Sequence, residues 1–134
     1  MNRLLLALPL LALAACAGSP TTRLSGAETR SETDTPRIVP AAVTATRQGL
    51  QMELVTADGV ALIGTLRRGE TPVIVPLAAT GQPLIGGQPE LTGRIEGGGL
   101  AMDCRFLLLN EVRGIDGGGS GECRGGGRRV AFLF

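Results

Sequence analysis

Apolar and polar residues alternate along much of the chain after residue 49, as expected of strands that bury one face. The alternation runs through residues 50–54 and resumes at 60–66, with Asp58 and Gly59 between the two segments. An Asp-Gly pair in this position is typical of a β-hairpin with a tight, primed-type turn, and we predict one here. Its apolar positions are Leu50, Met52, Leu54, Val60, Leu62 and Leu66.

Proline and glycine interrupt the pattern in the middle of the chain. Pro72 and Pro76 bracket Val73–Val75, and because proline cannot donate to a β-ladder, a strand here is expected at a sheet edge. Residues 81–90, GQPLIGGQPE, contain so many turn-forming residues that we predict a loop. Further strands are predicted at 91–96, 121–124 and 129–134.

The segment LAMDCRFLLLNEVRG, residues 100–114, fits two kinds of element. A helix would end at Gly114 and would have an apolar stripe of Leu100, Cys104, Leu107, Leu108 and Val112. A strand would place on one face Leu100, Met102, Cys104, Phe106 and Leu108. The content of Leu, Met, Glu and Arg favours the helix. The flanking glycines and the alternating VAFLF downstream favour the strand, which is our prediction.

The length of 134 residues suits one ordinary domain. Residues 17–49 are rich in Ser, Thr and Pro and show no sustained apolar period, so we predict that the segment 16–49 is a flexible linker. Ile38 and Val39 are its one apolar patch and are expected to reach the edge of the domain at most. The predicted fold is therefore mainly β, a small antiparallel sheet, sandwich or partly open barrel formed by residues 50–134.

The charge of the chain is balanced. All 13 basic residues are arginine, and without Arg3 the remaining twelve match the 12 carboxylates. A domain with no net field has no electrostatic attraction for nucleic acid or for an acidic substrate, and we expect no nucleic-acid partner.

The first fifteen residues have the anatomy of a secretory signal peptide. Arg3 provides the positive region, Leu4–Ala12 the apolar region, and small residues follow. The apolar run is too short to cross a bilayer as a helix. Residues 1–15 are therefore predicted to direct export and to be excluded from the fold.

The sequence Leu13-Ala14-Ala15-Cys16 resembles the lipobox of bacterial lipoproteins. The resemblance implies cleavage before Cys16 and attachment of lipid chains to its sulfur and to the new amino group. Several acyl chains anchor a protein far more firmly than one. In the Gram-negative family an Asp after the lipidated Cys retains the protein at the inner membrane. Ala17 stands there in this chain, so the resemblance implies an outer-membrane location facing the periplasm.

Cys104 and Cys123 remain once Cys16 carries lipid. If the two face each other across an antiparallel pair, the hairpin centre falls between Arg113 and Gly114, beside the turn-rich stretch IDGGGSG. We predict a disulfide between them, as suits an oxidising compartment, with two buried free thiols as the alternative. Two cysteines without a histidine provide too few ligands for a metal site.

No motif for catalysis or for a cofactor emerges. The stretch GGGSGE at 117–122 approaches the G-x-S-x-G nucleophile motif, but the chain has no histidine to act as base. No lysine follows the glycine runs, so they do not match a phosphate-binding loop. The carboxylates that might form an acid–base pair are Asp103, Glu111, Asp116 and Glu122, and their spacing is that of solvated turn residues.

The C-terminal stretch CRGGGRRVAF resembles the C-x-x-G…V-x-F stretch of periplasmic C-type lysozyme inhibitors. The match involves Cys123, Gly126, Val130 and Phe132, while Gly121 stands where that family has tyrosine. Our leading expectation is a lipid-anchored, non-enzymatic β-domain that binds or scaffolds in the cell envelope. Its partners would be the membrane and an envelope protein. An enzyme inhibitor of this kind and a hydrolase using only carboxylates are the two alternatives.

Overall fold

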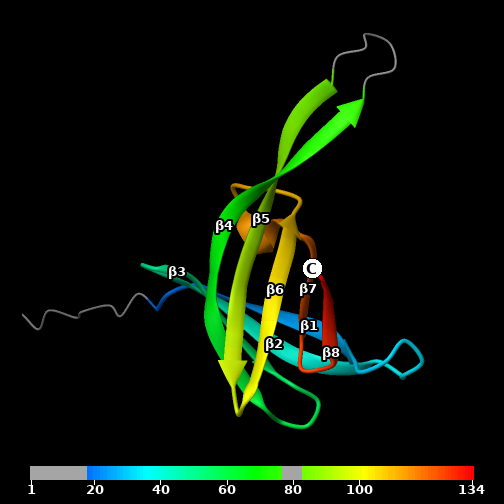
Figure 1. Cartoon of the computed structure of the whole chain (residues 1–134). Helices are drawn as coiled ribbons and strands as arrows, with labels where there is room; N and C mark the ends of the chain where they lie inside the picture. Colours follow the sequence, from blue (N-terminus) through cyan, green and yellow to red (C-terminus); the bar gives the residue numbers. More distant parts are fainter. Residues whose placement is uncertain (1–17, 77–82) are drawn as a thin grey trace, which may run out of the picture.

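The computed structural model describes residues 18–76 and 83–134, which form a closed antiparallel β-barrel with one short 3₁₀ helix, η1 (Figure 1). Each strand pairs with the next, and β8 pairs with β1 to close the barrel. The prediction of a mainly β, antiparallel fold is confirmed, and the barrel is closed rather than partly open. The elements are β1 (Thr21–Thr29), β2 (Arg37–Thr46), β3 (Gly49–Val55), β4 (Ala61–Pro76), β5 (Pro83–Gly97), β6 (Leu100–Leu108), η1 (Gly114–Gly117), β7 (Gly119–Gly125) and β8 (Arg128–Leu133).

The prediction of a flexible linker over residues 16–49 is wrong, because β1 and β2 occupy most of that segment. Both strands alternate between the barrel interior and its outer wall, as strands with one buried face do. The period is hard to see in the sequence because several inward positions are occupied by small or charged residues, including Gly26, Glu28 and Ala41. The domain therefore begins by Thr21, and its predicted boundary at residue 50 is wrong.

The hairpin at Asp58 and Gly59 is confirmed, but its turn differs from the predicted one. Leu54 pairs with Leu62, which centres the hairpin on Asp58. The Gly59 amide donates to the Thr56 carbonyl at 2.9 Å, and Gly59 has a φ of +86°. Neither Ala57 nor Asp58 has a positive φ, so this is a longer connection with glycine in its last position, and not a primed two-residue turn.

β4 and β5 continue beyond the barrel as a two-stranded ribbon (Figure 1). The pairing of β3 with β4 stops at Leu66, whereas β4 and β5 stay paired out to Pro76 and Pro83. The strand expected between Pro72 and Pro76 therefore has β5 on one side and no described strand on the other, as the edge prediction requires. The loop predicted at 81–90 is wrong, because β5 begins at Pro83.

The strand interpretation of residues 100–108 is confirmed, since β6 covers this range and its even-numbered side chains from Met102 onward are buried. Cys104 pairs directly with Cys123 on β7, and the two form the predicted disulfide inside the barrel. The chain after β6 turns through η1, where Ile115 is buried beneath the barrel rim.

Glycine and phenylalanine alternate across four neighbouring strands of the interior. Gly26 pairs with Phe132, Phe132 pairs with Gly121, and Gly121 pairs with Phe106. The two rings lie 5.4 Å apart between centroids, and side chains on the glycines would collide with them. Small and large residues thus complement each other in the closed barrel, and three phenylalanines suffice for the core.

The two ends of the barrel differ. The odd-numbered strands begin at one end of the barrel, which we call the N-terminal end. They finish at the opposite end, which we call the polar end. The N-terminal end also holds η1, which is tied to the start of β1 by the Thr22 hydroxyl donating to Asp116 at 2.6 Å. Within the described residues, no helix has the length and apolarity needed to cross a membrane.

Candidate functional site

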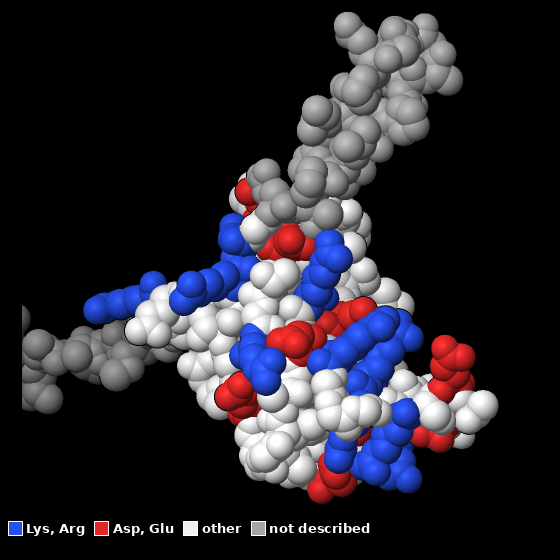
Figure 2. All heavy atoms as spheres, viewed as in Figure 1, with Lys and Arg blue, Asp and Glu red and all other residues white. Residues whose placement is uncertain are grey.

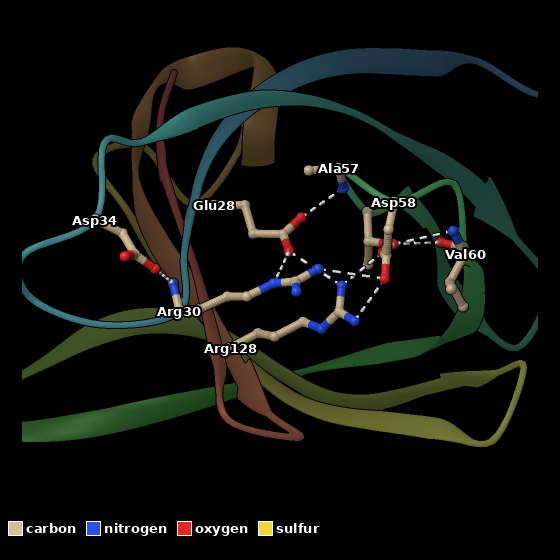
Figure 3. A network of polar contacts seen from close by, with 8 residues as sticks. Glu28, Arg30, Asp34, Ala57, Asp58, Val60 and Arg128 are labelled. Carbon is tan, nitrogen blue, oxygen red and sulfur yellow. Dashed lines mark hydrogen bonds and ion pairs between the residues drawn. The ribbon is translucent and has the colours of Figure 1, made fainter.

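Charged side chains close the polar end of the barrel (Figure 3). They come from the end of β1, the β3–β4 connection and the start of β8. We call Glu28, Arg30, Thr56, Asp58 and Arg128 the polar cluster. It is the largest connected group of ion pairs at this end among the described residues, and we take it and the adjoining surface as the candidate site.

The strand period places two of these residues over the core. Glu28 continues the inward-facing series of β1 after Leu24 and Gly26, and is 3% exposed. Arg128 precedes Val130 and Phe132 at the same spacing on β8. The Glu28 carboxylate and the Arg128 guanidinium thus occupy the inward positions nearest the polar end on two neighbouring strands. Charges are tolerated in such a buried place because they are paired.

The Glu28 carboxylate is held by backbone and side-chain donors. The Ala57 amide donates to Oε2 at 2.6 Å, and Arg128 donates from Nη1 to Oε1 at 3.2 Å. The Nε of Arg30 lies 4.0 Å from Oε1. Together these contacts offset the desolvation of a carboxylate whose side chain is only 2% exposed.

Asp58 receives the strongest contacts of the polar cluster. Arg128 binds it with both terminal nitrogens, at 2.6 and 2.7 Å, in the two-pronged geometry that suits guanidinium and carboxylate. Thr56 donates its hydroxyl to Oδ1 at 2.6 Å, and Arg30 approaches Oδ2 at 3.3 Å. The hydrogen bonds from Arg128 and then Thr56 hold the pKa of Asp58 far below its ordinary value, and Asp58 in turn raises the pKa of Arg128. Both groups therefore stay charged across the physiological range.

Two open clefts flank the polar cluster. The smaller, of about 340 Å³, lies between the end of β1 and the β1–β2 connection, and its lining includes Glu28, Arg30, Asp34 and Arg37. The larger, of about 850 Å³, lies between the β1–β2 connection and the β7–β8 turn, where Arg124 is part of the lining. Arg37 forms no ion pair with a described residue, so it offers a free guanidinium to a ligand. These clefts suit a polar group that has acceptor atoms.

The outer wall carries further charges, which Figure 2 shows interleaved over the visible face. Glu122 on β7 binds Arg124 and Arg129, each at 2.9 Å, and Arg94 binds Glu96 at 2.7 Å. The arginines lower the pKa of Glu122, Arg124 first. Such exposed pairs each contribute little to stability, and they keep the wall soluble without creating a patch of one sign.

The residues singled out in the sequence lie in separate places. Cys16 is outside the described residues. Asp103 and Glu122 face outward on the barrel wall, whereas Glu111 and Asp116 lie in the β6–β7 connection. The four carboxylates do not converge into a site. Sequence reasoning missed the polar cluster because Glu28 fell in the supposed linker, where the small and charged inward residues of β1 hide the alternation.

The residues behind the lysozyme-inhibitor likeness have structural roles here. Cys123 forms the disulfide, Val130 and Phe132 are buried in the core, and Gly126 adopts a φ of +57° in the β7–β8 turn. Among the described residues, no group of three or more Cys, Asp or Glu side chains is placed to hold a metal ion. No protein-family model, curated protein or solved structure matches the chain.

Proposed function

We propose that this protein is a non-enzymatic binding or scaffolding module of the cell envelope, anchored by lipid on Cys16, that offers its polar end to a partner. The observation that carries the proposal is the opposition of the two barrel ends. The chain enters at the N-terminal end, and both clefts lie at the polar end. A module anchored at Cys16 would therefore direct its clefts away from the membrane and toward the periplasm, with the outer membrane as the expected site.

The chemistry of the polar cluster supports binding more than catalysis. A general acid needs a pKa near the working pH, whereas Asp58 has a strongly lowered pKa and remains ionised. Every buried polar side-chain atom in the described part of the chain has a hydrogen-bond partner, so the polar cluster is satisfied without a substrate. The available donors are the exposed ones at its margin, Arg37 above all.

The anchor is tested by replacing Cys16 with serine in cells. We expect Cys16→Ser to abolish incorporation of a labelled fatty acid and to leave an unprocessed precursor or a protein released from membranes. A conservative matched control is Ala17→Ser, which leaves the thiol in place and keeps the label. Unchanged acyl labelling and membrane retention of Cys16→Ser would overturn the anchor.

The binding face is tested with a photocrosslinking amino acid placed at single positions in cells. Thr35 lines the smaller cleft, and Gln51 lies on the outer wall of β3, so the two positions are a matched pair. We expect a discrete crosslinked partner from position 35 and none from position 51. Crosslinks of equal yield from both positions, or from neither, would contradict a partner at the polar end.

A further inference from the structure

The N-terminal end of the barrel carries arginines that have no acidic partner among the described residues. Arg23 lies near the start of β1, Arg47 in the β2–β3 turn, Arg67 and Arg68 at the level where β3 begins, and Arg113 in the β6–β7 connection. None of the five forms an ion pair with a described residue. Figure 2 shows basic side chains along this margin, between the start of the described chain and the β4–β5 ribbon.

The arginines of the two ends differ in how far they are paired with carboxylates. At the polar end, Arg30, Arg124, Arg128 and Arg129 are each bound to a carboxylate, and Arg37 is the exception among the described residues. At the N-terminal end, Arg68 follows the inward-facing Leu66 by two residues on β4 and so belongs to the same face of the strand. Its Nη2 lies 3.4 Å from the position that a Cβ on Gly114 would occupy. The carboxylates of the β6–β7 connection are Glu111 and Asp116, and Asp116 is engaged by Thr22.

Large apolar side chains are exposed at the same end. Leu109 and Val112, both in the β6–β7 connection, are 78% and 93% exposed. The connection is held in shape by the Leu109 amide donating to the Gly118 carbonyl at 3.0 Å and by the Gly114 amide donating to the Asn110 carbonyl at 3.0 Å. Apolar side chains on an ordered loop, beside unpaired cations, form the kind of surface that fits the boundary between lipid headgroups and acyl chains.

The length of chain before β1 limits where this surface can be. Five residue steps separate Cys16 from Thr21, and a fully extended chain spans no more than about 18 Å over that length. A lipid on Cys16 would thus hold the N-terminal end close to the headgroups. Anionic lipids attract unpaired arginines at this end. Each arginine near the surface shifts the membrane-binding equilibrium by about fivefold.

We propose that the N-terminal end is a membrane-contact surface, in which Leu109 and Val112 enter the headgroup boundary and Arg47 and Arg113 bind anionic lipid headgroups. This inference rests on the lipid anchor of the proposed function and adds to it a fixed orientation on the bilayer. A flexible tether would let the barrel tumble, whereas this contact holds the polar end outward.

The test uses the lipidated protein, extracted from membranes and reconstituted into vesicles of phosphatidylcholine and phosphatidylglycerol that contain spin-labelled lipid as quencher. The chain has no tryptophan, so Val112→Trp and Ile38→Trp each introduce a single indole. Ile38 is 75% exposed on β2 at the polar end, so it is a matched control for Val112. Flotation of the vesicles first establishes that each variant is anchored.

We expect the Val112→Trp indole to be quenched and blue-shifted and the Ile38→Trp indole to remain unquenched. Adding Arg47→Gln and Arg113→Gln to Val112→Trp should lower the ratio of quenched to unquenched indole by about fivefold for each arginine removed. A protein that floats but leaves the Val112→Trp indole unquenched overturns the contact and leaves the anchor intact. A protein that does not float overturns the anchor itself. Quenching that is unchanged in vesicles of phosphatidylcholine alone overturns the role given to the arginines.

Discussion

Replacing Arg128 with methionine should destabilise the barrel by leaving a buried charge without its main partner. Arg128 is the only side chain that donates to Glu28 within hydrogen-bond distance in the described structure, at 3.2 Å, and the Glu28 side chain is 2% exposed. Breaking a buried ion pair by removing one partner costs about 3–5 kcal/mol. We expect the lower end, about 3 kcal/mol, because the Ala57 amide stays bound and Arg30 lies 4.0 Å away.

The origin of that cost is tested by a double-mutant cycle. Glu28→Gln alone should cost about 1.5–3 kcal/mol, the scale of a hydrogen bond to a charged group. If the loss in Arg128→Met comes from the stranded carboxylate, adding Glu28→Gln should restore part of the stability, so the double variant unfolds at a higher urea concentration than Arg128→Met.

Urea unfolding at neutral pH measures these differences by far-ultraviolet circular dichroism, since the chain has neither tryptophan nor tyrosine to report by fluorescence. The reasoning is refuted if Arg128→Met costs less than about 1 kcal/mol. It is also refuted if the double variant loses as much free energy of unfolding as the two single variants lose together, because Glu28 and Arg128 would then contribute independently.

Three other predictions concern the disulfide, the strand spacing and acid stability. Reduction of Cys104–Cys123, which are 19 residues apart, should lower the free energy of unfolding by about 3 kcal/mol; mass spectrometry that finds two free thiols in the exported protein would contradict the bridge. Gly64→Ala should cost about 2 kcal/mol, because a Cβ there would overlap the Arg94 carbonyl of β5. Gly69→Ala on the same strand meets no atom of the described residues closer than 3.8 Å and should be near neutral, so equal thermal stability of the two variants would refute this. Because its folded-state pKa is lowered, Asp58 stabilises the fold at pH values above its unfolded pKa of about 3.9, and this contribution disappears as the pH falls from about 5 toward 2. Asp58→Asn should therefore flatten that part of the curve of stability against pH. An unchanged slope would contradict this prediction.

The strands that could be predicted from the sequence are those whose inward positions are large and apolar. Met52, Leu54 and Phe106 reveal their period directly, and all three are fully buried. β1 was missed because Gly26 makes room for Phe132 on β8, which is distant in sequence and adjacent in the closed barrel. A small residue that complements a large one elsewhere has no local signal, since the partner is defined only by the closure of the sheet.

The dependence on barrel closure also explains why the disulfide could be predicted from the sequence and the polar cluster could not. Cys104 and Cys123 lie on strands joined by one connection, so their spacing around a turn-rich stretch, with the even cysteine count and the expected oxidising compartment, favoured a bridge between them. Arg128 meets Asp58 across 70 positions and Glu28 across 100. These contacts depend on the closure of β8 onto β1, which no local pattern in the chain predicts.

The most direct test of the central claim, a lipid-anchored barrel that begins by Thr21 and rests on the bilayer, is neutron reflectometry of the lipidated protein on a supported membrane. The account predicts protein density that starts at the headgroup layer, because only residues 17–20 separate Cys16 from the first strand. A hydrated gap on the order of 30 Å between headgroups and protein, the reach of a flexible linker of roughly thirty residues, would contradict it.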